Sequence, residues 1–177
     1  MGSRLTVSAS VPSRWPPLHL VGRDLAAVGL LGVVWWLELR FRDGSALGWA
    51  VTVFAGVLTA FVGFLMHEYG HLTASLATGA KVSYPRSPLC TLIFHFDSAQ
   101  NDRRQFLWMS MGGYLATLVA VALIVALCPL DAWSGRISLL LAGAGTIVTF
   151  VLEVPITVRV LRGASLPLDA AYRPYEG

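Results

Sequence analysis

Two histidines and a glutamate near the middle of the chain have the types and the spacing that suit metal-dependent hydrolysis. His67, Glu68 and His71 form an H-E-x-x-H sequence. Residues four apart on an α-helix lie on one face, with Cβ atoms roughly 6 Å apart, so both imidazoles can bind one tetrahedral metal ion. Glu68 is placed beside them, where it can take a proton from a metal-activated water. The motif therefore predicts a Zn²⁺ site with Glu68 as the catalytic base.

A catalytic zinc site needs a third protein ligand, and two carboxylates are candidates. Glu153 interrupts an otherwise apolar stretch, and helix geometry brings it to a depth similar to that of His67. Asp169 lies in the C-terminal tail beyond Arg159 and Arg162, so it would have to fold back toward the bilayer. The depth argument favours Glu153 as the third ligand. The alternatives are a Glu153 that is paired with a basic group or protonated, and an Asp169 that is a solvated tail charge.

The elements that must position these residues are apolar. Of 177 residues, 55% are hydrophobic and 13% are charged, and the mean hydropathy is +0.65, which is too apolar for a water-soluble domain. A helix needs roughly 20 apolar residues to cross a bilayer. The candidate spans are residues 25–37, 46–66, 105–130 and 137–158. We therefore predict an all-α polytopic membrane protein with about four transmembrane helices, whose second helix continues through the H-E-x-x-H motif.

Charge predicts the topology of these spans. We expect a cytoplasmic N-terminal tail over residues 1–24, a single transmembrane domain over residues 25–162 and a cytoplasmic C-terminal tail over residues 163–177. Four spans place both tails and the connection at 80–104 on one side. That side receives ten of the 13 Lys and Arg residues: Arg4, Arg14, Arg23, Lys81, Arg86, Arg103, Arg104, Arg159, Arg162 and Arg173. The positive-inside rule makes it the cytoplasmic side, in a membrane of the bacterial plasma-membrane type.

Several classes of protein are disfavoured by the same composition. The N-terminus lacks the pattern of a cleaved signal peptide. Basic residues form no stripe with interleaved aromatics, so we expect no nucleic-acid partner. Cys90 and Cys128 are too few and too far apart to predict a disulfide scaffold or a cysteine zinc site. The lipid bilayer is the expected environment, and the oligomeric state is not predicted.

On these motifs the chain resembles the site-2 protease family of intramembrane zinc metalloproteases, over residues 61–170. The HExGH motif of that family stands here as residues 67–71, with Gly70 before the second histidine. The other similar segments are a β-rich connection at 80–84 and 91–96, a polar stretch at 101–106 and a small-residue motif at 111–116. His95, on one of the expected strands, is interpreted as structural.

The resemblance bears differently on the third ligand. It implies an Asp in a Pro-x-Asp-Gly context, preceded by Asn-x-x-Pro. Asp169 follows Pro167 at the right spacing, but Ala170 replaces the Gly and Leu152 stands where the Asn is expected. The resemblance thus favours Asp169, whereas helix depth favours Glu153.

The expected function is zinc-dependent hydrolysis of a peptide bond within a transmembrane-helix substrate protein, by a metal-activated water. Departures from the family pattern leave two alternatives open. One is a membrane metalloenzyme that acts on a lipid or another small apolar molecule at the same site. The other is a membrane adaptor whose site is vestigial.

Overall fold

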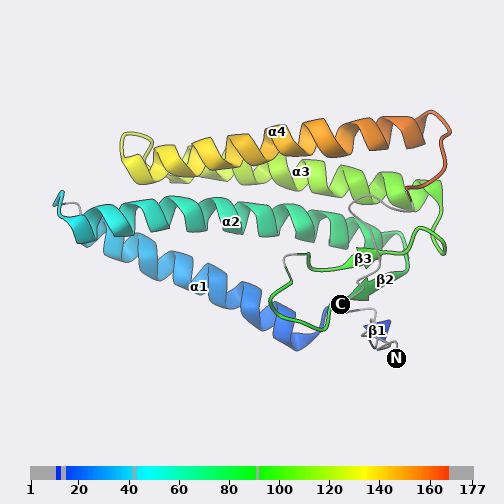
Figure 1. Ribbon diagram of the computed structural model, residues 1–177, viewed down its shortest axis with the longest axis horizontal. Helices are drawn as coiled ribbons and strands as arrows, with labels where there is room; N and C mark the ends of the chain where they lie inside the picture. Colours follow the sequence, from blue (N-terminus) through cyan, green and yellow to red (C-terminus); the bar gives the residue numbers. More distant parts are fainter. Residues whose placement is uncertain (1–10, 13–14, 42, 91, 168–177) are drawn as a thin grey trace, which may run out of the picture.

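The computed structural model describes residues 11–12, 15–41, 43–90 and 92–167. Four long helices lie roughly side by side, and a small sheet sits at one end of them (Figure 1). The helices are α1 (Leu18–Arg40), α2 (Ala46–Ala77), α3 (Arg103–Leu127) and α4 (Trp133–Leu161). The strands are β1 (Val11–Pro12), β2 (Val82–Tyr84) and β3 (His95–Phe96).

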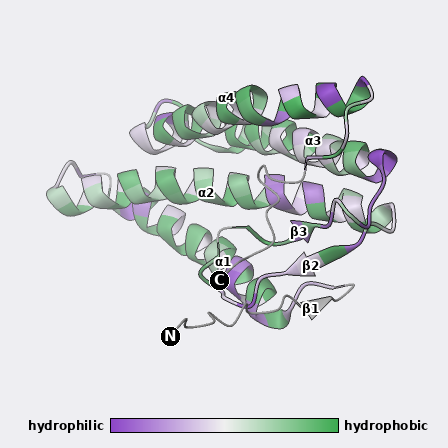
Figure 2. Ribbon diagram, turned by 45° about the vertical axis from the view of Figure 1, so that its right-hand side comes forward, coloured by the Kyte–Doolittle hydropathy of each residue, from purple (hydrophilic) through white to green (hydrophobic). Residues whose placement is uncertain are grey.

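All four helices are long and apolar enough to cross a membrane, by length and composition. Apolar residues run along most of each helix (Figure 2). Many of them face outward, among them Leu118 at 61% exposed and Ile147 at 65% exposed. Leaving each such side chain in water costs about 1.5–3 kcal/mol, which favours an apolar surrounding such as a bilayer. The predicted all-α polytopic fold with about four spans is confirmed.

Helix α2 is the central element, because it packs against each of the other three. Ser45 caps its start, where the side chain accepts a hydrogen bond from the backbone N–H of Gly48 at 3.0 Å. Its 32 residues extend about 48 Å at 1.5 Å per residue, which exceeds the hydrocarbon thickness of about 30 Å. Gly79 ends the segment with φ of +70°, a conformation that favours glycine.

Helices α2 and α3 approach each other at backbone distance. A Cβ built on Gly70 would lie 2.4 Å from the carbonyl oxygen of Gly112, and one built on Gly112 would lie 2.3 Å from that of Gly70. Only glycine fits at both positions, as at other close crossings of membrane helices. The small-residue motif noted in the sequence therefore sets the register of α3 against the H-E-x-x-H helix.

The predicted β-rich connection follows α2 and closes the end of the bundle. Strands β1, β2 and β3 form an antiparallel sheet in that order, with Val11 opposite Tyr84 and Val82 opposite Phe96. The largest buried cluster joins this sheet to the ends of the helices; it includes Leu20, Leu72, Tyr84, Ile93, Phe96, Phe106 and Val160. Burial raises the pKa of Tyr84 to about 12, so this phenol stays neutral.

The N-terminal elements differ most from the predicted apolar stretches. Helix α1 begins at Leu18, seven residues before the predicted span. The prediction started late because the first turns of the helix carry the polar residues His19, Arg23 and Asp24, which interrupt the apolar pattern. Strand β1 also lies within the segment expected to be an N-terminal tail. Helix α4 continues through Pro155, which removes one helical hydrogen bond without ending the helix.

Candidate metal centre

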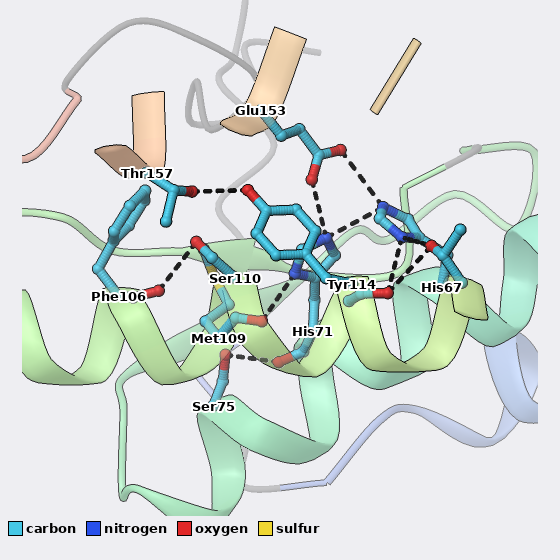
Figure 3. Close-up of polar contacts among 11 residues, drawn as sticks. His67, His71, Ser75, Phe106, Met109, Ser110, Tyr114, Glu153 and Thr157 are labelled. Atoms are coloured by element: carbon cyan, nitrogen blue, oxygen red, sulfur yellow. Dashed lines mark hydrogen bonds and ion pairs between the residues drawn. The ribbon is translucent and has the colours of Figure 1, made fainter. Parts of the chain in front are cut away.

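The two motif histidines and Glu153 converge on one point between α2 and α4 (Figure 3). The Nε2 atoms of His67 and His71 are 3.0 Å apart. Oε1 of Glu153 lies 3.3 Å from Nε2 of His67, and Oε2 lies 3.4 Å from Nε2 of His71. One ligand atom from each residue lies within 4.8 Å of the others, so the group could hold a metal ion. Helix spacing aligns the histidines, and α4, which runs in the same direction as α2, brings Glu153 to their depth (Figure 1).

Hydrogen bonds on the far side of each imidazole fix which nitrogen carries the proton. Nδ1 of His71 lies 2.9 Å from the carbonyl oxygen of Met109, which can only accept. Nδ1 of His67 lies 2.8 Å from Oγ1 of Thr117. The Thr117 hydroxyl donates in turn to the carbonyl oxygen of Gly113 at 3.0 Å, so it accepts from His67. Both Nδ1 atoms are therefore donors, which leaves the two Nε2 atoms, facing each other and Glu153, available as metal ligands.

The donor set is of the type that zinc takes, two imidazole nitrogens and a carboxylate. A tetrahedral zinc ion with bonds of about 2.0–2.1 Å requires donor atoms roughly 3.3 Å apart. The two Nε2 atoms are 3.0 Å apart, and each oxygen of Glu153 lies 3.3 or 3.4 Å from one of the two histidines. His67, His71 and Glu153 therefore match zinc in donor type, and their donor atoms lie close enough together to share one ion.

Gly113 makes room for one of the histidines. A Cβ built on Gly113 would lie 2.2 Å from Cε1 and 2.3 Å from Nε2 of His71. The His71 imidazole thus packs directly on the backbone of α3, and the Gly113 carbonyl oxygen lies 3.2 Å from Nδ1 of His67. Because the His71 ring comes so close, only glycine fits at position 113.

A second hydrogen bond holds α4 near the site. The hydroxyls of Tyr114 and Thr157 are 2.7 Å apart, and Thr157 lies one helical turn beyond Glu153. Tyr114 follows Gly113 on α3, and its ring lies beside the Glu153 carboxylate (Figure 3). The pair anchors the turn of α4 that carries Glu153. Sequence reasoning did not identify Tyr114, Thr117 or Thr157, because their roles depend on how the helices face one another.

Glu68 is not one of the three converging donors. It is 8% exposed, and its carboxylate lies near the backbone of Ile93, which belongs to the loop between β2 and β3. Glu68 is close enough to His67 and His71 to interact with them electrostatically. This position leaves its carboxylate free of the metal-binding cluster, as the motif predicts for a base.

The other residues noted in the sequence lie apart from this cluster. His95 is buried in β3, where burial lowers its pKa, so its ring is neutral near pH 7. Cys90 and Cys128 carry free thiols. Asp169, the alternative third ligand, lies outside the described residues.

No protein-family model, curated protein or solved structure matches this chain. The case for a metal centre therefore depends on the residues and the geometry of the chain itself.

Proposed function

We propose that the protein binds one Zn²⁺ ion through His67, His71 and Glu153 and hydrolyses a peptide bond in a transmembrane-helix substrate. The observation that carries this proposal is the convergence of two imidazole Nε2 atoms and a carboxylate, with one donor atom from each residue within 4.8 Å of the others. Zinc is the metal most often held by such a set with an open position in hydrolases. The site lies within helices long enough to span a bilayer, so the substrate is expected to be embedded in the membrane.

The chain's own groups supply the proton transfers. When bound, zinc supplies Lewis acidity that lowers the pKa of a water toward neutrality and polarises the scissile carbonyl. Glu68 accepts the proton of the attacking water and returns it to the leaving amine. His67 and His71 keep fixed tautomers through Thr117 and Met109. Because amides within a helix are hydrogen-bonded and shielded, a helical substrate must unwind near the bond that is cut.

Hydrolysis of a lipid or another small apolar molecule is the second candidate. An apolar groove of about 350 Å³ runs between α1 and α3 over α2, and Leu31, Met66 and Ile124 line it. Met66 directly precedes His67, and the groove has the volume of a small-molecule site. Such a groove suits an acyl chain as well as part of a helix.

Purified protein in detergent would separate these candidates. We expect it to cleave a synthetic transmembrane peptide that carries a helix-breaking Gly-Pro pair, and to leave phospholipids and their acyl esters intact. Matched Glu68→Gln protein is the negative control. Release of fatty acid from the lipids, with no cleavage of the peptide, would favour the second candidate. A purified wild-type protein that contains no metal and cleaves neither substrate would support the alternative of an adaptor with a vestigial site.

We also infer that both ends of the chain face the cytoplasm. The ends of α2 and α4 and the starts of α1 and α3 share the end of the bundle that carries the sheet (Figure 1). Arg23, Lys81, Arg86, Arg103, Arg104, Arg159 and Arg162 are the described basic residues at this end. Arg40 and Arg136 are the described ones at the other. The positive-inside rule supports a cytoplasmic location for the sheet.

A further inference from the structure

A chain of hydrogen bonds connects the motif helix, the start of α1 and the loop between β2 and β3. The hydroxyl of Tyr69 donates to Oδ2 of Asp24 at 2.8 Å. Nε of Arg23 donates to Oδ1 of the same carboxylate at 2.7 Å. Nη1 of Arg23 donates to the backbone carbonyl oxygens of Pro88, at 3.0 Å, and of Cys90. The motif helix and α1 therefore meet at the Asp24 carboxylate, and Arg23 connects that carboxylate to the loop.

The carboxylate of Asp24 is buried, which makes these contacts specific. Asp24 is 5% exposed, and a buried charge is tolerated only when it is paired and hydrogen-bonded. Each of its oxygens has its own donor, one from α2 and one from α1. Loss of either donor would leave a buried lone pair of Asp24 unsatisfied, which destabilises the contact.

The same loop reaches the proposed base. Ile93, which is 1% exposed, packs in one buried cluster with Leu72 of α2, and its backbone lies near the Glu68 carboxylate. Glu68 directly precedes Tyr69 in the chain. The loop is therefore linked to this part of α2 twice: through Arg23, Asp24 and Tyr69, and through Ile93 next to Glu68. Cys90, on the loop, is 3% exposed. The loop is thus attached to α1 at one point and to the motif helix at another.

We propose that Tyr69, Asp24 and Arg23 are positioning residues that hold the described parts of this loop, residues 85–90 and 92–94, closed against Glu68. The consequence for Glu68 as a base rests on the proposed function, whereas closure of the loop does not. This gives Tyr69 a defined role at a variable position of the H-E-x-x-H motif, because its hydroxyl joins the motif helix to Asp24 of α1.

Cys90 is a native probe of this closure. In full-length protein with Cys128→Ala, Cys90 is the remaining thiol, and its burial predicts slow labelling by a water-soluble maleimide. Tyr69→Phe removes one hydroxyl and should raise the labelling rate of Cys90 about tenfold, the effect of losing one buried hydrogen bond. In the peptide-cleavage assay the same variant should lower kcat with KM unchanged, because the loop positions the base.

Thr59→Val is the matched control. It removes another side-chain hydrogen bond between α1 and α2, from Nε1 of Trp35 to Oγ1 of Thr59 at 3.0 Å, and should leave Cys90 labelling unchanged. An unchanged rate in Tyr69→Phe, or an equal rise in both variants, would overturn the proposal. Should Tyr69→Phe fail to fold, Asp24→Asn provides the same test, since it keeps an acceptor but weakens the Arg23 contact. Labelling does not require metal, so wild-type protein that binds no zinc would refute the proposed function alone.

Discussion

Single residues divide the proposed chemistry between binding and proton transfer. His67 and His71 can present Nε2 to a metal ion because their other ring nitrogens donate to Thr117 and to the Met109 carbonyl. Glu153 completes the donor set. Glu68, near the loop between β2 and β3, lies outside this set. Substitutions at these positions should therefore separate loss of metal from loss of turnover.

Glu68→Gln tests the assignment of the base. Glutamine keeps the size of the side chain but cannot accept a proton, so we expect full zinc content with peptide cleavage reduced by about 10²–10⁴-fold. Metal analysis and the cleavage rate, measured on one sample, check this outcome. Cleavage that remains near the wild-type rate would assign the base elsewhere.

Glu153→Ala tests the third ligand. Loss of a direct ligand should weaken zinc binding by more than the roughly 10–100-fold typical of an outer-shell partner. Asp169→Ala serves as the comparison and should leave zinc affinity nearly unchanged. Competition with a chromophoric chelator measures both. If Asp169→Ala strips the metal and Glu153→Ala does not, the resemblance to the site-2 proteases is the better guide to the third ligand.

At the scale of helices, the site is produced by how α3 and α4 face α2. The contact between Gly70 and Gly112 sets how closely α3 approaches, and this register brings the Gly113 backbone onto His71 and Thr117 to His67. The hydroxyl pair of Tyr114 and Thr157 joins α3 to α4 one turn from Glu153.

Gly113→Ala tests this packing. Its methyl group would overlap the His71 ring, so either the ring or α3 must shift. We expect zinc affinity to fall by roughly 10–100-fold, as for other supports of a metal ligand. Gly143→Ala is the control, because a Cβ there meets nothing within 4 Å. Equal zinc affinity in the two variants would show that the site tolerates displacement of α3.

The candidate metal ligands could be predicted from local spacing, whereas the residues that hydrogen-bond to them or hold their helices could not. The interval between His67 and His71 predicts their shared face, and Glu153 stands out as a carboxylate in an apolar run. Thr117 and Tyr114 carry no such signal, since their partners lie on other helices and are fixed only by packing. Strand β1, of two residues, was missed because its sequence contains no alternating pattern and it is formed by pairing with β2.

For the whole molecule, the distribution of charge fixes the expected orientation. With the sheet on the cytoplasmic side, a cysteine introduced as Arg86→Cys into a chain lacking Cys90 and Cys128 should resist an impermeant maleimide added to intact cells. It should react after permeabilisation. Asp131→Cys, exposed in the turn at the opposite end, should react without permeabilisation. The reverse pattern would place the sheet outside the cytoplasm.

The zinc content of the purified protein tests the central claim most directly. Two imidazole nitrogens and a carboxylate that converge between α2 and α4 predict about one zinc ion per chain. Elemental analysis of wild-type protein and of the His67→Ala, His71→Ala double variant, both in detergent and both checked for folding by circular dichroism, measures it. The account predicts about one equivalent in the wild type and almost none in the double variant. Equal zinc in the two proteins, or no zinc in a folded wild type supplied with the metal, would contradict it.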